Sequence, residues 1–292
     1  MSLPDFLVIG AYKSGSTALH EALRAHPQVF VPAQKGPSFF AFDGVEEPDR
    51  PLPPGAVRSW EDYRALFDAA PPDAVRGEVS PEYLANPHAA GRIRERLSDV
   101  RLAAILRNPV ERAFSDYLMY VRDGLEPESD FGRALDAQEE RRRAAAPTGY
   151  YVETGFYGRQ LRPYFEAFPR GRIQVHLFED FAADPDAVLG RLFAFLGVDA
   201  SLGEAPERAV NVSGVPRNAL VAAGVRGGRR LAPLLPAAVR RRAKAALARG
   251  LDRPVLAPEH RRRLVELYRE DVAELERLLE RRLDRWLASP PT

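Results

Sequence analysis

Short apolar runs that lead into helical patterns recur along this chain, and they constrain its fold more than any other feature. The two clearest runs, residues 6–10 and 102–106, have the continuous apolar character of strands buried on both faces of a parallel sheet. Further strands are predicted at 29–31, 75–80 and 173–178. Strands that alternate with helices favour an α/β class: a three-layer, P-loop-like fold with a mainly parallel sheet of about five strands flanked by helices.

Local signals mark where several helices begin. Ser59 and Asp62 form a capping box, and the pairs Asn86-Pro87, Asn108-Pro109 and Asp184-Pro185 each supply a cap followed by proline at the first helical position. The last helix is predicted over 258–286. Residues 44–58 and 201–235 are rich in proline and glycine and are expected to be long surface loops. Neither an internal repeat nor a linker divides the sequence, so we expect one domain over 1–292.

Composition excludes several classes of protein. The 292 residues are 45% apolar and 28% charged with a net charge of +1, which argues against disorder and against general nucleic-acid binding. There is no cysteine, and the five histidines have no metal-ligand spacing. No apolar run approaches the roughly 18 residues of a membrane span, and the first residues lack a secretory signal. We therefore expect a cytoplasmic protein with no metal, nucleic-acid or membrane partner.

The loop after the first strand, residues 10–17, has the composition of an anion site. Backbone N–H groups at a helix N-terminus attract anions, Lys13 adds a full charge, and Ser14, Ser16 and Thr17 add hydroxyls beside Gly15. It is not a Walker A loop, because the lysine precedes the glycine. Taken alone, the loop is equally explained as a tight strand-to-helix turn with Gly15 at positive φ and Thr17 as the cap.

A second anion site is predicted at the end of the next clear strand. Arg107 follows residues 102–106 directly, and Ser115 lies two turns into the following helix. Ligands of open α/β sheets gather at the carboxyl ends of strands, so we expect Arg107 and Ser115 to face the same crevice as Lys13. Taken alone, residues 107–112 are better explained as a capped helix start with a local arginine–glutamate pair.

Together the two segments resemble a known family. Residues 13–17 (KSGST) are similar to the 5′-phosphosulfate loop of the sulfotransferases that use 3′-phosphoadenosine 5′-phosphosulfate (PAPS), and residues 107–115 (RNPVERAFS) resemble their 3′-phosphate motif. Further landmarks of the bacterial and heparan-sulfate-type branch are the segments 38–40, 77–84, 178–180 and 193–198. The similarity runs from about residue 5 to the last helix, and it is weakest over 121–150 and 220–255.

The resemblance implies in-line transfer of a sulfuryl group from PAPS to a hydroxyl or amine, with PAP as product and no metal. It implies that Lys13 contacts the leaving oxygen, that residues 14–17 hold the 5′-phosphate, and that Arg107 and Ser115 bind the 3′-phosphate. Residues 211–217 resemble a loop that closes over the nucleotide, in which Arg217 adds a further phosphate contact or is simply solvated.

The sequence departs from the family pattern at the general base. The segment before Phe39-Phe40 usually carries a glutamate that deprotonates the acceptor, and here Gly36 takes its place. Val79 also stands where the animal members carry lysine. Four explanations stay open: another carboxylate serves, an acidic acceptor needs little base, the chain is a substituted variant, or the alignment slips.

Candidate substitutes for the base come from nearby carboxylates. Glu78 is our first hypothesis, with a buried structural glutamate as its alternative. Asp43 and Glu82 follow, each better explained as a loop or surface residue. We expect His20 to be an ordinary residue of a helix face, and Lys35 to be either a cleft cation or a solvated loop lysine.

Two other function classes are weighed against the sulfotransferase. A P-loop kinase would need a magnesium-binding carboxylate where Arg107 stands. A non-catalytic nucleotide-binding relative is supported only by Gly36.

For the acceptor we expect a small natural product of bacterial secondary metabolism first and a carbohydrate second. The arginine-rich segment 208–250 could attract an anionic acceptor, but a solvated helix explains it better, and the sequence does not predict an oligomeric state.

Overall fold

A five-stranded parallel sheet forms the centre of the structure, a computed structural model that describes residues 3–46, 52–53, 55–144, 149–203, 215–217, 250–252 and 254–288. The strand order is β2-β3-β1-β4-β5. The strands are β1 (Phe6–Gly10), β2 (Val29–Phe30), β3 (Val75–Val79), β4 (Arg101–Leu106) and β5 (Ile173–Leu177). The predicted α/β class and the parallel sheet of about five strands are confirmed.

Strand β1 lies in the middle of the sheet because its side chains are apolar on both faces. All five of its residues are buried, and Phe6 is in register with Gly77 of β3 and Arg101 of β4. Phe6 and Val8 belong to one core cluster, whereas Leu7 and Ile9 belong to the other. The alternation of side chains along a strand thus divides the core into two layers.

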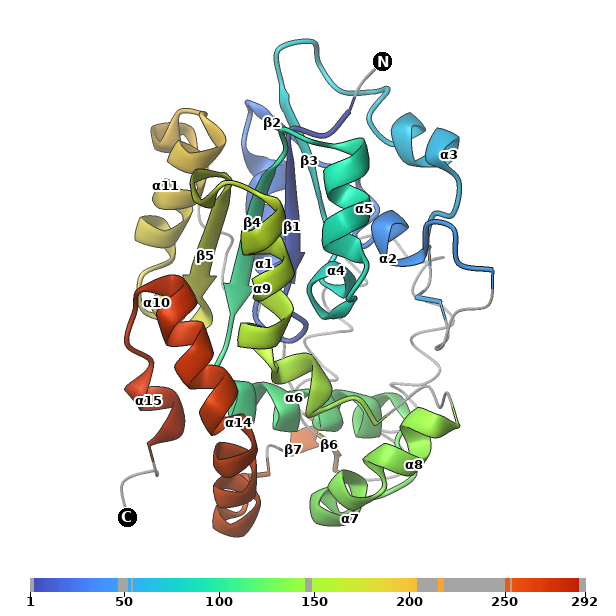
Figure 1. Cartoon of the computed structure of the whole chain (residues 1–292), viewed down its shortest axis with the longest axis vertical. Helices are drawn as coiled ribbons and strands as arrows, with labels where there is room; N and C mark the ends of the chain where they lie inside the picture. The colour runs from blue at the N-terminus through green and yellow to red at the C-terminus, as the bar shows by residue number, and fades with distance from the viewer. Residues whose placement is uncertain are drawn as a thin grey trace.

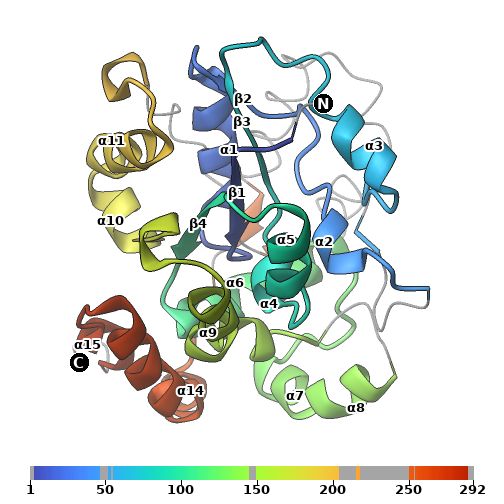
Figure 2. The same ribbon diagram turned by 45° about the horizontal axis from the view of Figure 1, so that its top comes forward.

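Helices cover both faces of the sheet (Figures 1 and 2). On one face lie α1 (Ser16–Ala25), α10 (Phe178–Ala183) and α11 (Pro185–Leu196). On the other lie α4 (Glu82–Ala85), α5 (Ala89–Arg96) and α9 (Tyr157–Ala167), with α9 packed against the C-terminal helix α14 (Pro258–Leu279). The carboxyl ends of the strands point toward α6 (Pro109–Asp123), which crosses below the sheet in Figure 1.

The remaining elements are short. They are α2 (Phe39–Phe42), α3 (Trp60–Ala65), α7 (Phe131–Asp136), α8 (Gln138–Arg143), α15 (Asp284–Leu287), the 3-10 turns Glu153–Gly155, Arg170–Arg172 and Ala200–Leu202, and a two-stranded sheet of β6 (Val215–Pro216) and β7 (Leu251–Asp252). No helix within the described ranges combines the length and the apolar character needed to cross a bilayer.

Three of the predicted helix starts are confirmed by their caps. The side chain of Ser59 accepts the N–H of Asp62, Asn108 accepts that of Val110, and Asp184 accepts that of Ala187. The start predicted at Asn86 is wrong. The Asn86 side chain accepts the N–H of His88 instead, and α5 begins only at Ala89.

The C-terminal prediction also needs correction. The helix that begins at Pro258 ends at Leu279, because Glu280 adopts a left-handed conformation with φ of 52°. A separate short helix, α15, follows from Asp284. Strand β5 likewise ends one residue earlier than predicted, since Phe178 begins α10. Most of the predicted loop 201–235 lies outside the described residues.

Candidate active site

The loop between β1 and α1 presents an uncapped helix N-terminus. Gly15 stands at the N-cap position with φ of 97°, and no side chain caps α1 there, nor does its first turn contain an acidic residue. Thr17 therefore does not act as the cap. The hydroxyl of Ser14, which is fully buried, donates to the carbonyl of Tyr12 over 3.3 Å. The first N–H groups of a helix without a side-chain cap favour an anionic ligand.

Lys35 reaches this loop from a distant part of the chain. Its ammonium donates to Thr17 Oγ1 over 2.9 Å and to Ser16 Oγ over 3.2 Å. Burial lowers the pKa of Lys35, while the charges of Glu82 and Glu21 act in the opposite direction. Of the two alternatives for Lys35, the solvated loop lysine is wrong, because its half-buried ammonium is bonded to the loop. The only feature of the sequence that sets Lys35 apart is that lysine is rare in it, with three lysines among 42 basic residues.

Arg107 lies on the other side of the loop. Its Nη1 donates to the carbonyl of Lys13 over 3.4 Å, and its guanidinium lies 5.1 Å from the centre of the Phe178 ring. The next residue, Asn108, caps α6 and donates its own N–H to Glu179 over 2.9 Å. The end of β4 therefore holds Arg107 beside the loop that follows β1, as the neighbouring positions of these two strands require.

The surroundings of Lys13 destabilise the charged, ammonium form of its side chain. Burial is the main cause, and it lowers the pKa of Lys13 to about 8; Arg122 and Arg107 lower it further, whereas Asp116 raises it. Lys13, Lys35 and Arg107 are thus three partly buried cations around one helix N-terminus. Such a grouping is costly without a counter-charge, and an anion with more than one phosphate group would supply it.

Ser115 and Arg217 are placed differently. Ser115 is buried on α6, the helix that begins beside Arg107. Arg217 is exposed at the end of β6 and forms an ion pair with Asp252 over 3.1 Å, which holds β6 to β7. Strand β6 packs against α6, so Arg217 lies on the side of the sheet where the strands end. Residues 211–214, the rest of the predicted closing loop, are outside the described ranges.

Glu78 is enclosed by the core. None of its surface is exposed, Ser80 Oγ donates to it over 2.7 Å, and the hydroxyl of Tyr63 lies 3.4 Å away. Burial raises the pKa of Glu78 to about 7. Ser80 Oγ in turn accepts the N–H of Ser38 over 2.9 Å, so Glu78 is linked through Ser80 to the turn at residues 36–38.

The other candidates for chemistry have structural partners. Asp43 forms an ion pair with Arg96 over 2.9 Å. His20 is buried and bonds to the carbonyl of Pro32 over 3.1 Å, in keeping with an ordinary helix-face residue. In the part of the chain that the structure describes, no three His, Cys, Asp or Glu side chains are grouped so as to hold a metal ion.

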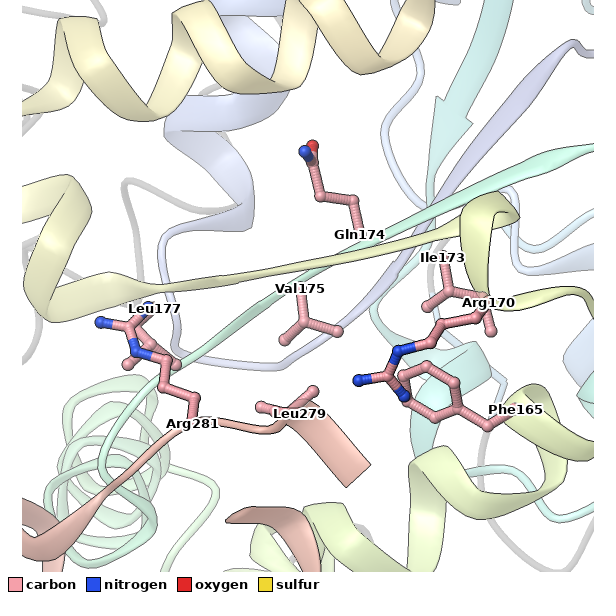
Figure 3. Close-up of a pocket in the computed structure, with 8 residues that line it drawn as sticks. All are labelled: Phe165, Arg170, Ile173, Gln174, Val175, Leu177, Leu279 and Arg281. Atoms are coloured by element: carbon pink, nitrogen blue, oxygen red, sulfur yellow. The ribbon is translucent and has the colours of Figure 1, made fainter. Parts of the chain in front are cut away.

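A pocket elsewhere in the structure does not belong to this site. It lies at the outer edge of β5, between Phe165 of α9 and Leu279 at the end of α14 (Figure 3). Arg170 and Arg281 stand at its two ends, but each has an acidic partner, Glu280 and Asp180 respectively. None of the residues predicted to bind a nucleotide lines it.

Comparison with known proteins places this geometry in a family. A family model described as "Sulfotransferase family" matches residues 4–201. The mouse heparan sulfate glucosamine 3-O-sulfotransferase 3B1 is 29% identical over 196 residues, which is 67% of this chain and 46% of that protein. The human heparan sulfate glucosamine 3-O-sulfotransferase 6 is 30% identical over 198 residues, covering 67% and 52%. The chain thus spans about half the length of the curated relatives it matches.

Solved structures agree with the sequence comparison. A sulfotransferase from Alicyclobacillus acidocaldarius is similar over 99% of this chain and 100% of its own, with a TM-score of 0.77 and 29% identity. The mouse sulfotransferase SULT7A1, solved in complex with PAP, shares the fold at a TM-score of 0.53 over 95% of this chain and 87% of its own, with 14% identity.

Proposed function

The chain belongs to the sulfotransferase family, and from this premise we propose that it is a sulfotransferase with PAPS as its donor and a hydroxyl or amine of a small natural product as its acceptor. A carbohydrate is the second candidate acceptor, since the names of the curated relatives specify glucosamine in heparan sulfate. The reaction would take place in the cytoplasm.

The proposal that PAPS is the donor rests on one observation: three cations lie around one helix N-terminus, on two sides of it. Lys13 and Lys35 stand on the loop side, where the amides and hydroxyls of residues 14–17 suit a 5′-phosphosulfate. Arg107 stands at the end of β4, with Ser115 on the helix that follows, where a 3′-phosphate would bind. Two anion positions on adjacent strand ends distinguish a nucleotide with a 3′-phosphate from ATP or ADP.

The proposed step needs positioning and positive charge more than bond-making groups on the protein. The acceptor oxygen attacks the sulfur in line, the bond from sulfur to the bridging oxygen breaks, and its electron pair stays on the 5′-phosphate of PAP. Lys13 offsets the charge that grows on that leaving oxygen, as preorganised cations do in phosphoryl transfer. Arg107, Ser115 and Arg217 hold the nucleotide while the acceptor approaches.

Metal-free calorimetry with PAP and with ADP tests the donor. We expect PAP to bind at least about tenfold more tightly than ADP, and Arg107→Ala to lose about 1.5–3 kcal/mol of PAP binding, which is roughly 10–150-fold. The matched control is Arg101→Ala at the opposite end of the same strand, which should bind PAP as the wild type does. Equal affinity of the wild type for PAP and ADP would contradict the proposed donor.

A further inference from the structure

Transfer to a hydroxyl releases a proton, and most carboxylates around the phosphate loop are already engaged. Asp116 forms an ion pair with the buried Arg112 over 3.0 Å, and Asp123 pairs with Arg122 over 2.9 Å. Glu179 accepts the N–H of Asn108. A carboxylate that already accepts a hydrogen bond from an arginine or a backbone amide must give up part of that contact to take a proton from an acceptor. These three groups therefore have structural roles that compete with proton transfer.

Glu78 faces a different obstacle. Its side chain has no exposed surface and is surrounded by Ser80, Tyr63 and the apolar core. A general base must come within hydrogen-bond reach of the proton that it removes. The turn at residues 36–38 is bonded to the end of β3, through the Gly36 N–H to the Val79 carbonyl at 3.0 Å and through the Ser38 N–H to Ser80 Oγ at 2.9 Å. Glu78 therefore lies in a closed hydrogen-bonded cluster without an exposed face for an acceptor.

Glu82 stands where the side chain of residue 36 would otherwise point. A Cβ built on Gly36 would lie 3.9 Å from Glu82 Oε2 and 4.0 Å from Oε1. The carboxylate thus occupies the space that opens beside Gly36, although it comes from α4 and lies 46 positions further along the chain.

Contacts with the phosphate loop orient this carboxylate. The hydroxyl of Tyr12, the residue before Lys13, donates to Glu82 Oε1. The charge of Glu82 also acts on Lys35, whose ammonium is bonded to Ser16 and Thr17. Glu82 Oε2 is buried and has no hydrogen-bond partner among the residues that the structure describes. One oxygen is therefore held by the loop, while no hydrogen bond within the described residues competes for the other. Unlike Glu78, which is fully enclosed, Glu82 as a whole is only half-buried.

We propose that Glu82 is the general base of this sulfotransferase and that it serves in place of a side chain at Gly36. The inference rests on the proposed function. As the acceptor oxygen bonds to sulfur, its proton passes to Glu82 Oε2, and the electron pair of the broken bond stays on the bridging oxygen beside Lys13. Tyr12 is a positioning residue, because it holds the carboxylate through Oε1.

The first test compares Glu82→Gln with the wild type in two measurements. We expect Glu82→Gln to bind PAP with unchanged affinity, since the amide keeps the shape of the side chain. We expect its acceptor-independent hydrolysis of PAPS, in which water replaces the acceptor, to fall by about 10²–10⁴-fold, the range typical for loss of a general base. Glu21→Gln is the matched control, because Glu21 is exposed on α1 and its charge also acts on Lys35.

Two acceptors that differ in whether they carry a proton distinguish the loss of a general base from a general loss of sulfuryl transfer. If 4-nitrobenzyl alcohol and 4-nitrophenol are used as probes, only the alcohol still carries its proton at alkaline pH. Glu82→Gln should lose transfer to the alcohol and retain transfer to the ionised phenol. Tyr12→Phe should show a smaller loss of the same kind, as expected for a residue that acts through Glu82.

The possible outcomes are distinct. A wild-type protein that neither binds PAP nor consumes PAPS would overturn the proposed function and this inference together. A Glu82→Gln variant that binds PAP and hydrolyses PAPS at the wild-type rate would overturn the inference alone. A loss confined to Glu78→Gln would assign the base to Glu78 instead.

Discussion

Burial brings the titration of the Lys13 ammonium down to mildly alkaline pH. The pKa of Lys13 is lowered to about 8, mainly by burial, so a growing fraction of the side chain is neutral above that pH. A bound 5′-phosphate favours the ammonium form and raises this pKa again. Binding above pH 8 must therefore be accompanied by proton uptake, and the affinity for PAP should fall by up to about tenfold for each further pH unit.

Calorimetry in two buffers with different heats of ionisation measures this uptake directly. About one pH unit above the pKa of Lys13, the wild type should take up most of one proton when PAP binds, and Lys13→Met should take up much less. Lys35→Met reports the share of the second lysine, whose pKa is also lowered by burial. Equal uptake by the wild type and Lys13→Met would show that Lys13 is not the group that titrates.

At the scale of single elements, the turn that carries Lys35 depends on Gly36. This residue has φ of 73°, a left-handed conformation that costs a residue with a Cβ about 1–2 kcal/mol. Its surroundings leave room for a methyl group, since the nearest atom to a Cβ there is Ser38 Oγ at 3.8 Å. We therefore expect Gly36→Ala to lower the free energy of unfolding in urea by about 1–2 kcal/mol through the backbone alone.

Gly91 is the matched control for that prediction. It lies in α5, where a Cβ would meet nothing within 4 Å, and its conformation is helical. Gly91→Ala should raise the free energy of unfolding by about 0.5–1 kcal/mol, because alanine favours a helix more than glycine does. If both substitutions changed stability in the same direction, strain at Gly36 would not be the cause.

At the scale of the whole molecule, α14 holds the start of α9. Asp271 of α14 accepts the backbone N–H groups of Gly158 and Arg159, both over 2.9 Å, and so caps a helix more than 100 positions away. Asp271 is 8% exposed, and its removal would leave two amides in a poorly solvated position.

Asp271→Ala should therefore lower the free energy of unfolding by about 2–4 kcal/mol. Glu266→Ala on the same helix is the control. Glu266 is exposed, and among the residues that the structure describes its ion-pair partner is Arg269, so its loss should cost less than about 0.5 kcal/mol. Equal effects of the two substitutions in urea unfolding would show that α14 does not stabilise α9 through this cap.

Helix α9 also shows why the sequence predicted some elements and missed others. Ser59, Asn108 and Asp184 each cap a helix within three residues of themselves, so the signal and its effect lie in one short segment. The N-terminus of α9 has no cap of its own, and Pro163 lies inside the helix. The residues around the start of α9 therefore give no local signal for a helix, because the side chain that caps it, Asp271, belongs to α14.

The amino-acid sequence by itself determined the alternation of buried strands and capped helices, and with it the parallel sheet and the sulfotransferase family. These properties follow from apolar runs, caps and a phosphate-loop motif, each contained in a few consecutive residues. Only the tertiary structure decided that Lys35 reaches Thr17 and that Glu82 lies beside Gly36. Both depend on how segments far apart in the chain are packed, and packing is a property of the whole fold.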